Sequence, residues 1–280
     1  MSWLFFILIS ALAVSVAALF QRLAMKEEAS DPVLSTIIFQ LLLTAIITPF
    51  AISQGFVWPS FDLWPFFLLS TLLYAVGSVM LFLSIKLIEA SEMTILSGVG
   101  AIAAMISAYI FLGERLVWSQ YLGAILVLLS VLMVQYRGQK FVFHKGAILA
   151  LAAASFFAFA TVSDVFIIKS YDAISFTSLI SLLPGLMLCF LYPKKSLQLP
   201  KAIRTVNKNL IAYTLIYSIG TITFYTALGK GALLSQVSVI MRINIILTVL
   251  LAAVFLKERD NFYRKVIAAL ICMAGVILVA

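Results

Sequence analysis

The chain has 280 residues, of which 64% are hydrophobic and 11% are charged, and its mean hydropathy is +1.16. A soluble domain of this length does not bury so much apolar surface, because roughly half of a globular surface faces water. The net charge of +8 does not indicate a nucleic-acid partner, because the basic residues lie in short links between apolar runs.

The apolar runs are each about twenty residues long, which is the length a helix needs to cross about 30 Å of hydrocarbon. Barrel strands would instead be segments of about ten residues with alternating polarity. The sequence therefore predicts an all-α membrane protein with about ten transmembrane helices. The runs are approximately Ser2–Leu23, Leu34–Ile52, Leu63–Ile88, Ser91–Phe111, Trp118–Gln135, Gly146–Lys169, Ala173–Tyr192, Leu210–Leu228, Ala232–Leu256 and Phe262–Ala280.

The start of the chain is interpreted as the first membrane helix. Met1–Leu19 is apolar, but no positive charge precedes it, as a cleaved signal peptide would require. Asp31 and Pro32 predict the N-terminus of the second helix, with an aspartate as N-cap and a proline in the first helical position.

The orientation of the helices follows from the distribution of Lys and Arg over the links. The links after odd-numbered runs carry 15 of the 19 basic residues, and those after even-numbered runs carry 3. Positive charge in short loops marks the cytoplasmic side. We therefore expect a multi-pass protein of a bacterial inner (plasma) membrane with both termini outside.

The two halves of the chain resemble each other. The segment Ile110–Arg115 (IFLGER) is similar to Val254–Arg259 (VFLKER), and at the same offset of 144 residues Ser91 matches Ser235. Five helices are an odd number, so two homologous five-helix units in one chain enter the membrane from opposite sides. The sequence thus predicts two inverted repeats, an architecture suited to alternating access around a site between the halves.

These features resemble a known family. Two membrane helices that end in Leu-x-Glu-Arg, each followed by an apolar helix, are similar to the EamA domains of the drug/metabolite transporter superfamily, and Glu114 and Glu258 match its recurrent glutamate. The resemblance covers residues 1–136 and 145–280 as two EamA-like repeats. It implies a ten-helix secondary carrier with a central cavity for amino acids, nucleosides, sugar phosphates or other metabolites.

Arg242 is the most informative ionisable residue, because a charge within a membrane span costs several kcal/mol. It lies ten residues past Ala232, about 15 Å deep at 1.5 Å per residue, and shares one helical face with Ser235 and Ser238. Its guanidinium group suits a carboxylate or phosphate. Two hypotheses stay open: Arg242 binds an anionic group of the substrate, or it forms a structural ion pair within the bundle.

Asp164 is the expected ion-pair partner of Arg242, because it also lies within a span, five residues before Lys169. Proton coupling is the alternative role for this carboxylate. The first helix contains no acidic residue, whereas small multidrug-resistance relatives depend on a carboxylate there. This absence favours a carrier of neutral, zwitterionic or anionic metabolites over a cation/proton antiporter of that type.

Other polar and aromatic residues within the spans are candidates for the wall of a cavity, although single tyrosines also occur in the interfacial belt. In the third run, Tyr74 and Ser78 share one helical face. In the eighth run, Tyr213, Tyr217 and Thr221 form a stripe at i, i+4 and i+8, and Tyr225 lies one turn further. The predicted substrate-binding residues are Arg242, Ser238, Tyr74, Ser78, Tyr217, Thr221, Tyr225, Gln40 and Gln21. The glutamates near helix ends, Glu258 included, fit capping or solvated positions better than substrate contact.

Secondary transport of a small metabolite, amino-acid-like or otherwise bearing an anionic group, is the function that the sequence favours. Cys189 and Cys272 fall inside predicted helices and show no metal spacing, so we expect no cofactor and no metal. The expected partners are the metabolite and membrane lipid, without nucleic acid, and a monomer suffices. The alternatives are a lipid-flipping or structural membrane partner and, with one histidine available, a membrane-embedded lipid enzyme.

Overall fold

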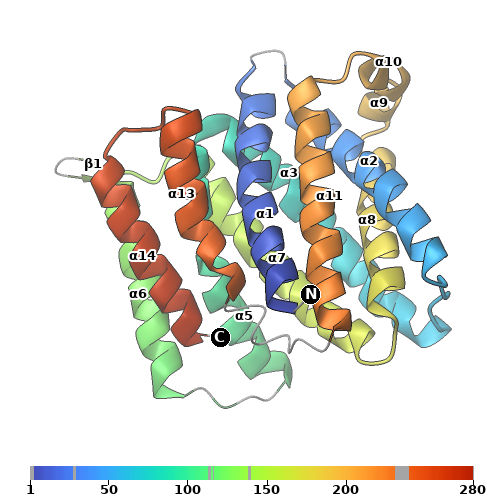
Figure 1. Ribbon diagram of the computed structural model, residues 1–280, viewed down its shortest axis with the longest axis horizontal. Coiled ribbons are helices and arrows are strands. Elements are labelled where there is room, and N and C mark those ends of the chain that lie inside the picture. The colour runs from blue at the N-terminus through green and yellow to red at the C-terminus, as the bar shows by residue number, and fades with distance from the viewer. Residues whose placement is uncertain are drawn as a thin grey trace.

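The protein is described by a computed structural model, which covers residues 3–27, 30–112, 115, 117–137, 140–230 and 240–279. The described chain is almost entirely helical (Figure 1). In chain order the elements are α1 (Trp3–Lys26), α2 (Pro32–Ser53), η1 (Phe61–Leu63), α3 (Trp64–Leu87), α4 (Ala90–Leu96), α5 (Val99–Leu112), α6 (Trp118–Gln135), β1 (Tyr136–Arg137), β2 (Lys140–Phe141), α7 (Lys145–Ile168), α8 (Ala173–Leu191), α9 (Pro193–Ser196), α10 (Leu199–Arg204), α11 (Lys208–Gly229), α13 (Ile243–Phe255) and α14 (Phe262–Val279).

Eight helical segments are long and apolar enough to cross a membrane. They are α1, α2, η1 with α3, α4 with α5, α6, α7, α8 and α14. In addition, α11 has 22 residues and packs against α1 and α2, and the apolar α13 has 13 residues. The all-helical, multi-pass prediction is confirmed, whereas the count of ten stays a prediction because residues 232–239 of the ninth run lie outside the described residues.

The outer surface of the bundle is apolar. On α6, for example, Leu122, Ile125, Leu128 and Leu129 are all exposed. Such a continuous apolar face would be unstable in water but is stable against hydrocarbon.

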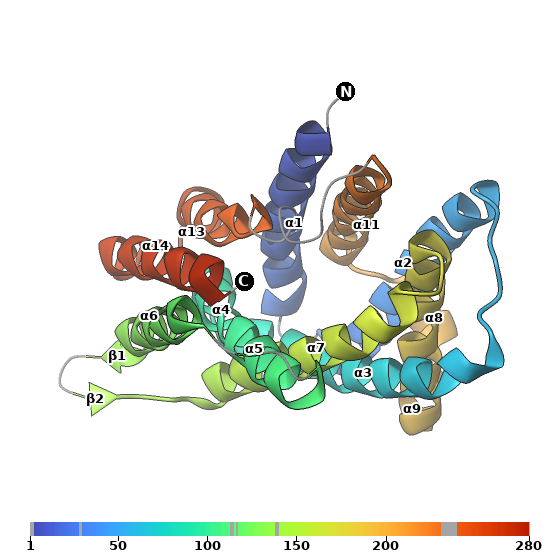
Figure 2. The ribbon, with the colours of Figure 1, turned by 90° about the horizontal axis from the view of Figure 1, so that it is seen from below.

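The two halves of the chain are interleaved rather than set side by side. Helix α1 packs against α11, α3 against α7, α2 against α8, and α6 against α14 (Figures 1 and 2). Each of these pairs joins a helix from the first half to one from the second. The space between the halves is therefore bordered by both.

The fourth membrane segment is broken where the sequence has its glycines. Helix α4 ends at Leu96 and α5 begins at Val99, so Gly98 lies at the break. A Cβ atom at Gly98 would lie 2.3 Å from Cys272 Sγ of α14, so either this side chain or its helix would have to shift. Arg242 lies 144 residues after Gly98 and is therefore its equivalent in the second repeat. It is the N-cap of α13. The segment before α13 is thus interrupted at the position equivalent to the glycine break.

Local signals for the helix ends are partly confirmed. Asp31 caps α2 as expected, because its Oδ1 accepts hydrogen bonds from the backbone N–H groups of Val33 (3.0 Å) and Leu34 (3.1 Å). A short antiparallel hairpin in the α6–α7 link, with Tyr136 opposite Phe141, was not predicted. Two-residue strands carry too little pattern to be read from a sequence.

Candidate functional site

A cavity of about 900 Å³ lies between α2, α3, α7, α8 and α11, so both halves contribute to its wall. This volume lies within the range of pockets that hold small organic ligands. Six residues singled out from the sequence line it: Gln40, Tyr74, Ser78, Asp164, Tyr217 and Thr221. They come from four helices, two in each half of the chain, and the fold brings them to one space.

Asp164 is the buried carboxylate of the wall, with 6% of its surface exposed. Its Oδ1 accepts a hydrogen bond from the Ser70 hydroxyl (2.7 Å), and its Oδ2 accepts one from the Tyr74 hydroxyl (2.6 Å). Ser70 and Tyr74 are one turn apart on α3, which packs against α7. Two neutral donors from one helix therefore hold the carboxylate in a fixed orientation.

Neutral polar groups from α2, α3 and α11 complete the wall. The Gln40 side-chain amide donates to the Ser78 hydroxyl over 3.3 Å, and both side chains are buried. The Thr221 hydroxyl donates to the backbone carbonyl of Tyr217 in its own helix. These groups satisfy one another, which permits them to lie at membrane depth.

Four aromatic rings, which we call the aromatic cluster, close the inner end of the cavity. They are Phe39, Phe82, Tyr213 and Tyr217. Phe39 and Tyr213 are stacked with centroids 4.7 Å apart, and Phe82 and Tyr217 lie 5.8 and 5.5 Å from Phe39. Phe82 lies near the end of α3 and Tyr213 near the start of α11, so the cluster lies toward the end of the molecule where α3 finishes.

The other end of the cavity reaches the surface where α7 ends and α8 begins. Its lining there includes Ile168, Asp172 and Ala173, and Ile168 and Asp172 are exposed. Asp172 caps α8 by accepting a hydrogen bond from the backbone N–H of Ser175 (2.7 Å). We call this end of the molecule the mouth end.

The structure does not bring Arg242 and Gln21 into the described wall of this cavity. Gln21 is 3% exposed. Among the described residues, neither Gln21 Nε2 nor Arg242 Nε has a hydrogen-bond partner. Ser238 lies outside the described residues, as does the side chain of Tyr225. The roles predicted for these four residues stay predictions.

The expected pairing of Arg242 with Asp164 is not formed. Both oxygens of Asp164 accept hydrogen bonds from Ser70 and Tyr74 of α3. Arg242 precedes α13, which packs against α1, α4 and α14, whereas Asp164 lies on α7, which packs against α3 and α5. The two charges therefore belong to different parts of the bundle.

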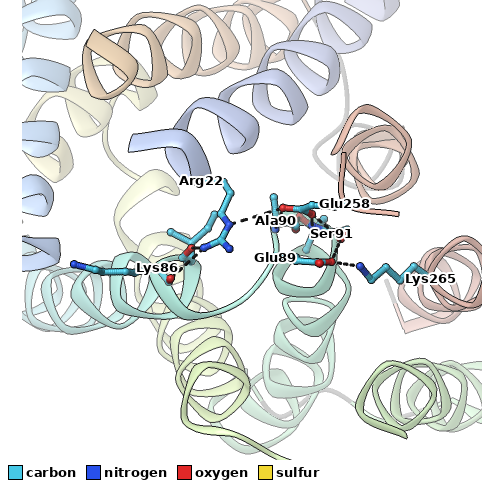
Figure 3. Close-up of polar contacts among 9 residues, drawn as sticks. Arg22, Lys86, Glu89, Ala90, Ser91, Glu258 and Lys265 are labelled. Atoms are coloured by element: carbon cyan, nitrogen blue, oxygen red, sulfur yellow. Dashed lines mark hydrogen bonds and ion pairs between the residues drawn. The ribbon is translucent and has the colours of Figure 1, made fainter. Parts of the chain in front are cut away.

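At the end opposite the mouth, Glu258 joins the two halves (Figure 3). Its Oε1 accepts a hydrogen bond from the backbone N–H of Ala90 (3.1 Å), and its Oε2 accepts from the N–H (3.1 Å) and hydroxyl (2.8 Å) of Ser91. The Nε of Arg22 lies 3.8 Å from Glu258 Oε1. The glutamate of the second repeat motif thus caps a helix of the first half. A capping role for Glu258 is confirmed.

Further charged contacts surround Glu258 (Figure 3). The Arg22 guanidinium donates to the backbone carbonyls of Ile85 (2.5 Å) and Lys86 (3.1 Å), and Lys265 forms an ion pair with Glu89. We call Arg22, Glu89, Ser91, Glu258 and Lys265 the Glu258 cluster, and this end of the molecule the Glu258 end. Its contacts tie α1 and α4 of the first half to the α13–α14 region of the second.

Sequence reasoning missed Ser70, the aromatic residues Phe39 and Phe82, and the place of Asp172 at the mouth. Ser70 was detectable, since it lies one turn from Tyr74 on the face that carries the other predicted residues of α3. The phenylalanines gave no signal, because aromatic residues are common throughout the apolar runs.

Comparison with known proteins supports the same architecture. The model of the EamA-like transporter family matches residues 1–136 and 144–280. A solved structure, described only as a crystal structure of a protein, has 16% sequence identity and a TM-score of 0.57 and covers 98% of this chain and 94% of its own. That likeness shows the fold alone. No curated protein matches the chain.

Proposed function

Because the chain belongs to the EamA-like transporter family, we propose that it is a secondary carrier that moves a small metabolite across a membrane by alternating access. The observation that carries the proposal is the cavity between the halves, which reaches the surface at the mouth end. At the opposite end, the Glu258 cluster joins the same two halves. A solute site with one open and one closed end is the arrangement that alternating access requires.

The pattern of helix packing supports two inverted five-helix repeats. If the halves correspond, α1 is equivalent to α7 and α3 to α11. The packed pair α1–α11 then corresponds to the packed pair α7–α3, while α2–α8 and α6–α14 each correspond to themselves. A pseudo-two-fold axis between the halves produces this pattern, and rocking about it would open each end in turn.

In this conformation the carrier is open at the mouth end and closed at the Glu258 end. The basic links lie at the Glu258 end, which supports a cytoplasmic location for that end and an outward-open assignment for the described state. By the repeat offset, Glu114 and Ser235 are the expected counterparts of Glu258 and Ser91. Both lie outside the described residues, so their role in closing the mouth end is a prediction from the repeat.

The proposed substrate contacts are the neutral lining residues predicted from the sequence, namely Gln40, Tyr74, Ser78, Tyr217 and Thr221. The expectation of an anionic substrate rested on Arg242, which does not line the described wall. The proposal therefore keeps the carrier function and the cavity. The charge expected of the substrate is inferred from the residues that line the cavity.

The test is vectorial transport by the purified protein in proteoliposomes. Labelled metabolites should be taken up saturably and exchanged against unlabelled solute, with uptake lost when the aromatic cluster is opened by Tyr217→Ala. Chemical conversion of a substrate without movement across the bilayer would contradict the proposal. A reporter fused to the C-terminus tests the orientation and should be active only on the outside.

A further inference from the structure

The cavity has an unusual distribution of charge for a site that was expected to bind an anion. Among the described residues of its wall, only Asp164 and Asp172 carry a charged side chain at neutral pH, and none is Lys, Arg or His. Asp172 is exposed at the mouth and caps α8. Asp164 is therefore the buried charge that a bound solute would meet.

The surroundings of Asp164 leave it able to bind a cation. A carboxylate has about four acceptor sites, and the hydroxyls of Ser70 and Tyr74 occupy two. These donors are neutral, so they orient the carboxylate without cancelling its charge. A counter-charge stabilises a buried carboxylate further than neutral hydrogen-bond donors do. In the described part of the chain the wall provides none, so a cation from the cavity can fill this role.

The rest of the wall suits the body of an organic cation. Eight aromatic rings line the cavity: Phe39, Tyr74, Phe82, Phe157, Phe176, Tyr213, Tyr217 and Phe224. Aromatic faces attract ammonium groups and also provide apolar contact area. Tyr74 belongs both to the carboxylate site and to the aromatic wall. Its hydroxyl donates to Asp164, and the centroid of its ring lies 5.8 Å from that of Phe157.

We propose that the carrier recognises an organic ammonium ion, whose charged nitrogen binds Asp164 and whose apolar body packs against the aromatic wall. This inference rests on the proposed transport function and specifies its substrate class. The sequence pointed away from cations because the first helix has no acidic residue. The structure supplies the carboxylate from α7 instead.

Direct binding tests the inference with three probes of similar size and different charge. Phenethylamine is a cation at neutral pH, phenethyl alcohol is neutral, and hydrocinnamate is an anion. We expect isothermal titration with the purified protein to show binding of phenethylamine at least about tenfold tighter than that of the other two. Equal affinity for the three would overturn the inference, and a preference for hydrocinnamate would overturn it and indicate an anion site.

Substitutions at Asp164 locate the binding. Asp164→Asn keeps the shape and the acceptor for one hydroxyl but removes the charge, and it should weaken phenethylamine binding about tenfold or more. Asp164→Glu keeps the charge and should retain most of the affinity. The matched control is Asp62→Asn, the same change at an exposed aspartate outside the cavity, which should bind as wild type does. Unchanged binding by a folded Asp164→Asn protein would overturn the inference, because it would show that Asp164 serves only as a structural hydrogen-bond acceptor.

These experiments distinguish a failure of the proposed transport function from a failure of the proposed substrate class. If phenethylamine binds through Asp164 but does not exchange across proteoliposomes, the substrate class stands and the carrier function fails. If a labelled neutral or anionic metabolite is transported while phenethylamine neither binds nor competes, the carrier function stands and the cation inference fails.

Discussion

The two polar regions of this bundle treat charge in opposite ways. In the Glu258 cluster every carboxylate has a basic partner: Glu258 lies near Arg22, and Glu89 pairs with Lys265. In the cavity, Asp164 has the hydroxyls of Ser70 and Tyr74 as its hydrogen-bond donors, and the described wall contains no basic residue.

This difference separates structural charges from charges available to a solute. Paired charges at the Glu258 end join helices from both halves. Asp164 also joins the halves, through the hydroxyls of Ser70 and Tyr74. Because the described wall gives it no basic partner, its charge is one that a cationic ligand can balance. The substitutions below test whether the two regions are as independent as this comparison implies.

The largest effect is expected at Glu258. Glu258→Gln removes a charge that accepts hydrogen bonds from two backbone N–H groups and one hydroxyl and lies near Arg22. Breaking one partner of a buried charged network costs about 3 kcal/mol. Thermal unfolding in detergent should show this loss, and the Glu258 end should open more often.

The control is Glu27→Gln, because Glu27 is exposed and outside the cluster. Phenethylamine binding should survive Glu258→Gln if the cavity is independent. Equal unfolding temperatures for the two variants would show that the Glu258 cluster does not hold the halves together.

A smaller effect is expected where Gly123 of α6 approaches Gly275 of α14, ten residues along α14 from Lys265 of the Glu258 cluster. A Cβ at Gly123 would lie 2.5 Å from the backbone oxygen of Gly275, closer than real contacts allow. Gly123→Ala should therefore cost about 1–3 kcal/mol of stability through overpacking. Thermal unfolding measures this loss of stability. We expect the variant to leave unchanged which end of the cavity is open.

Val254→Ile provides the matched control for Gly123→Ala. It also adds one carbon, but at a position on α13 that is 65% exposed and faces lipid. If both variants lose the same stability, the close approach of the two glycines is not what limits the α6–α14 contact.

The smallest effect is expected at Asp31 and Lys195, an ion pair that is more exposed than those of the Glu258 cluster. Burial alone would raise the pKa of Asp31, but hydrogen bonds from Lys195 and from the N-terminus of α2 lower it below the ordinary 3.8. A lowered pKa contributes stability that is present above the ordinary value and is lost as the pH falls through the lowered one.

Asp31→Asn keeps a good N-cap residue and removes only the charge, so it should cost less than about 1 kcal/mol at neutral pH. The difference in unfolding temperature between wild type and variant should shrink as the pH falls below 3.8. A difference that persists at low pH would assign the effect to capping rather than to the ion pair.

The sequence predicted the helices well because a membrane helix needs a long apolar run, and length and composition alone reveal it. Trp118–Gln135 was expected as one helix and is α6. Polar residues within the runs, such as Gln40 and Asp164, were also found, since their placement in lipid is costly.

The partners of these residues were not predictable, because the choice between Arg242 and Ser70 as the neighbour of Asp164 depends on which helix packs against α7. Helix packing in a membrane follows shape and small residues more than any pattern visible in one sequence. For the same reason Glu258 could be placed at a helix end but not assigned to the helix of the other half that it caps.

The most direct test of the account is the accessibility of the cavity from each side of the membrane. In a Cys189→Ser background, Thr221→Cys places one reactive thiol in the wall, while the buried Cys272 stays unreactive. A membrane-impermeant maleimide should label this thiol from the mouth end, and Glu258→Gln should make it reachable from the Glu258 end as well. Labelling that stays confined to the mouth end when Glu258 is neutralised would contradict alternating access through this cavity.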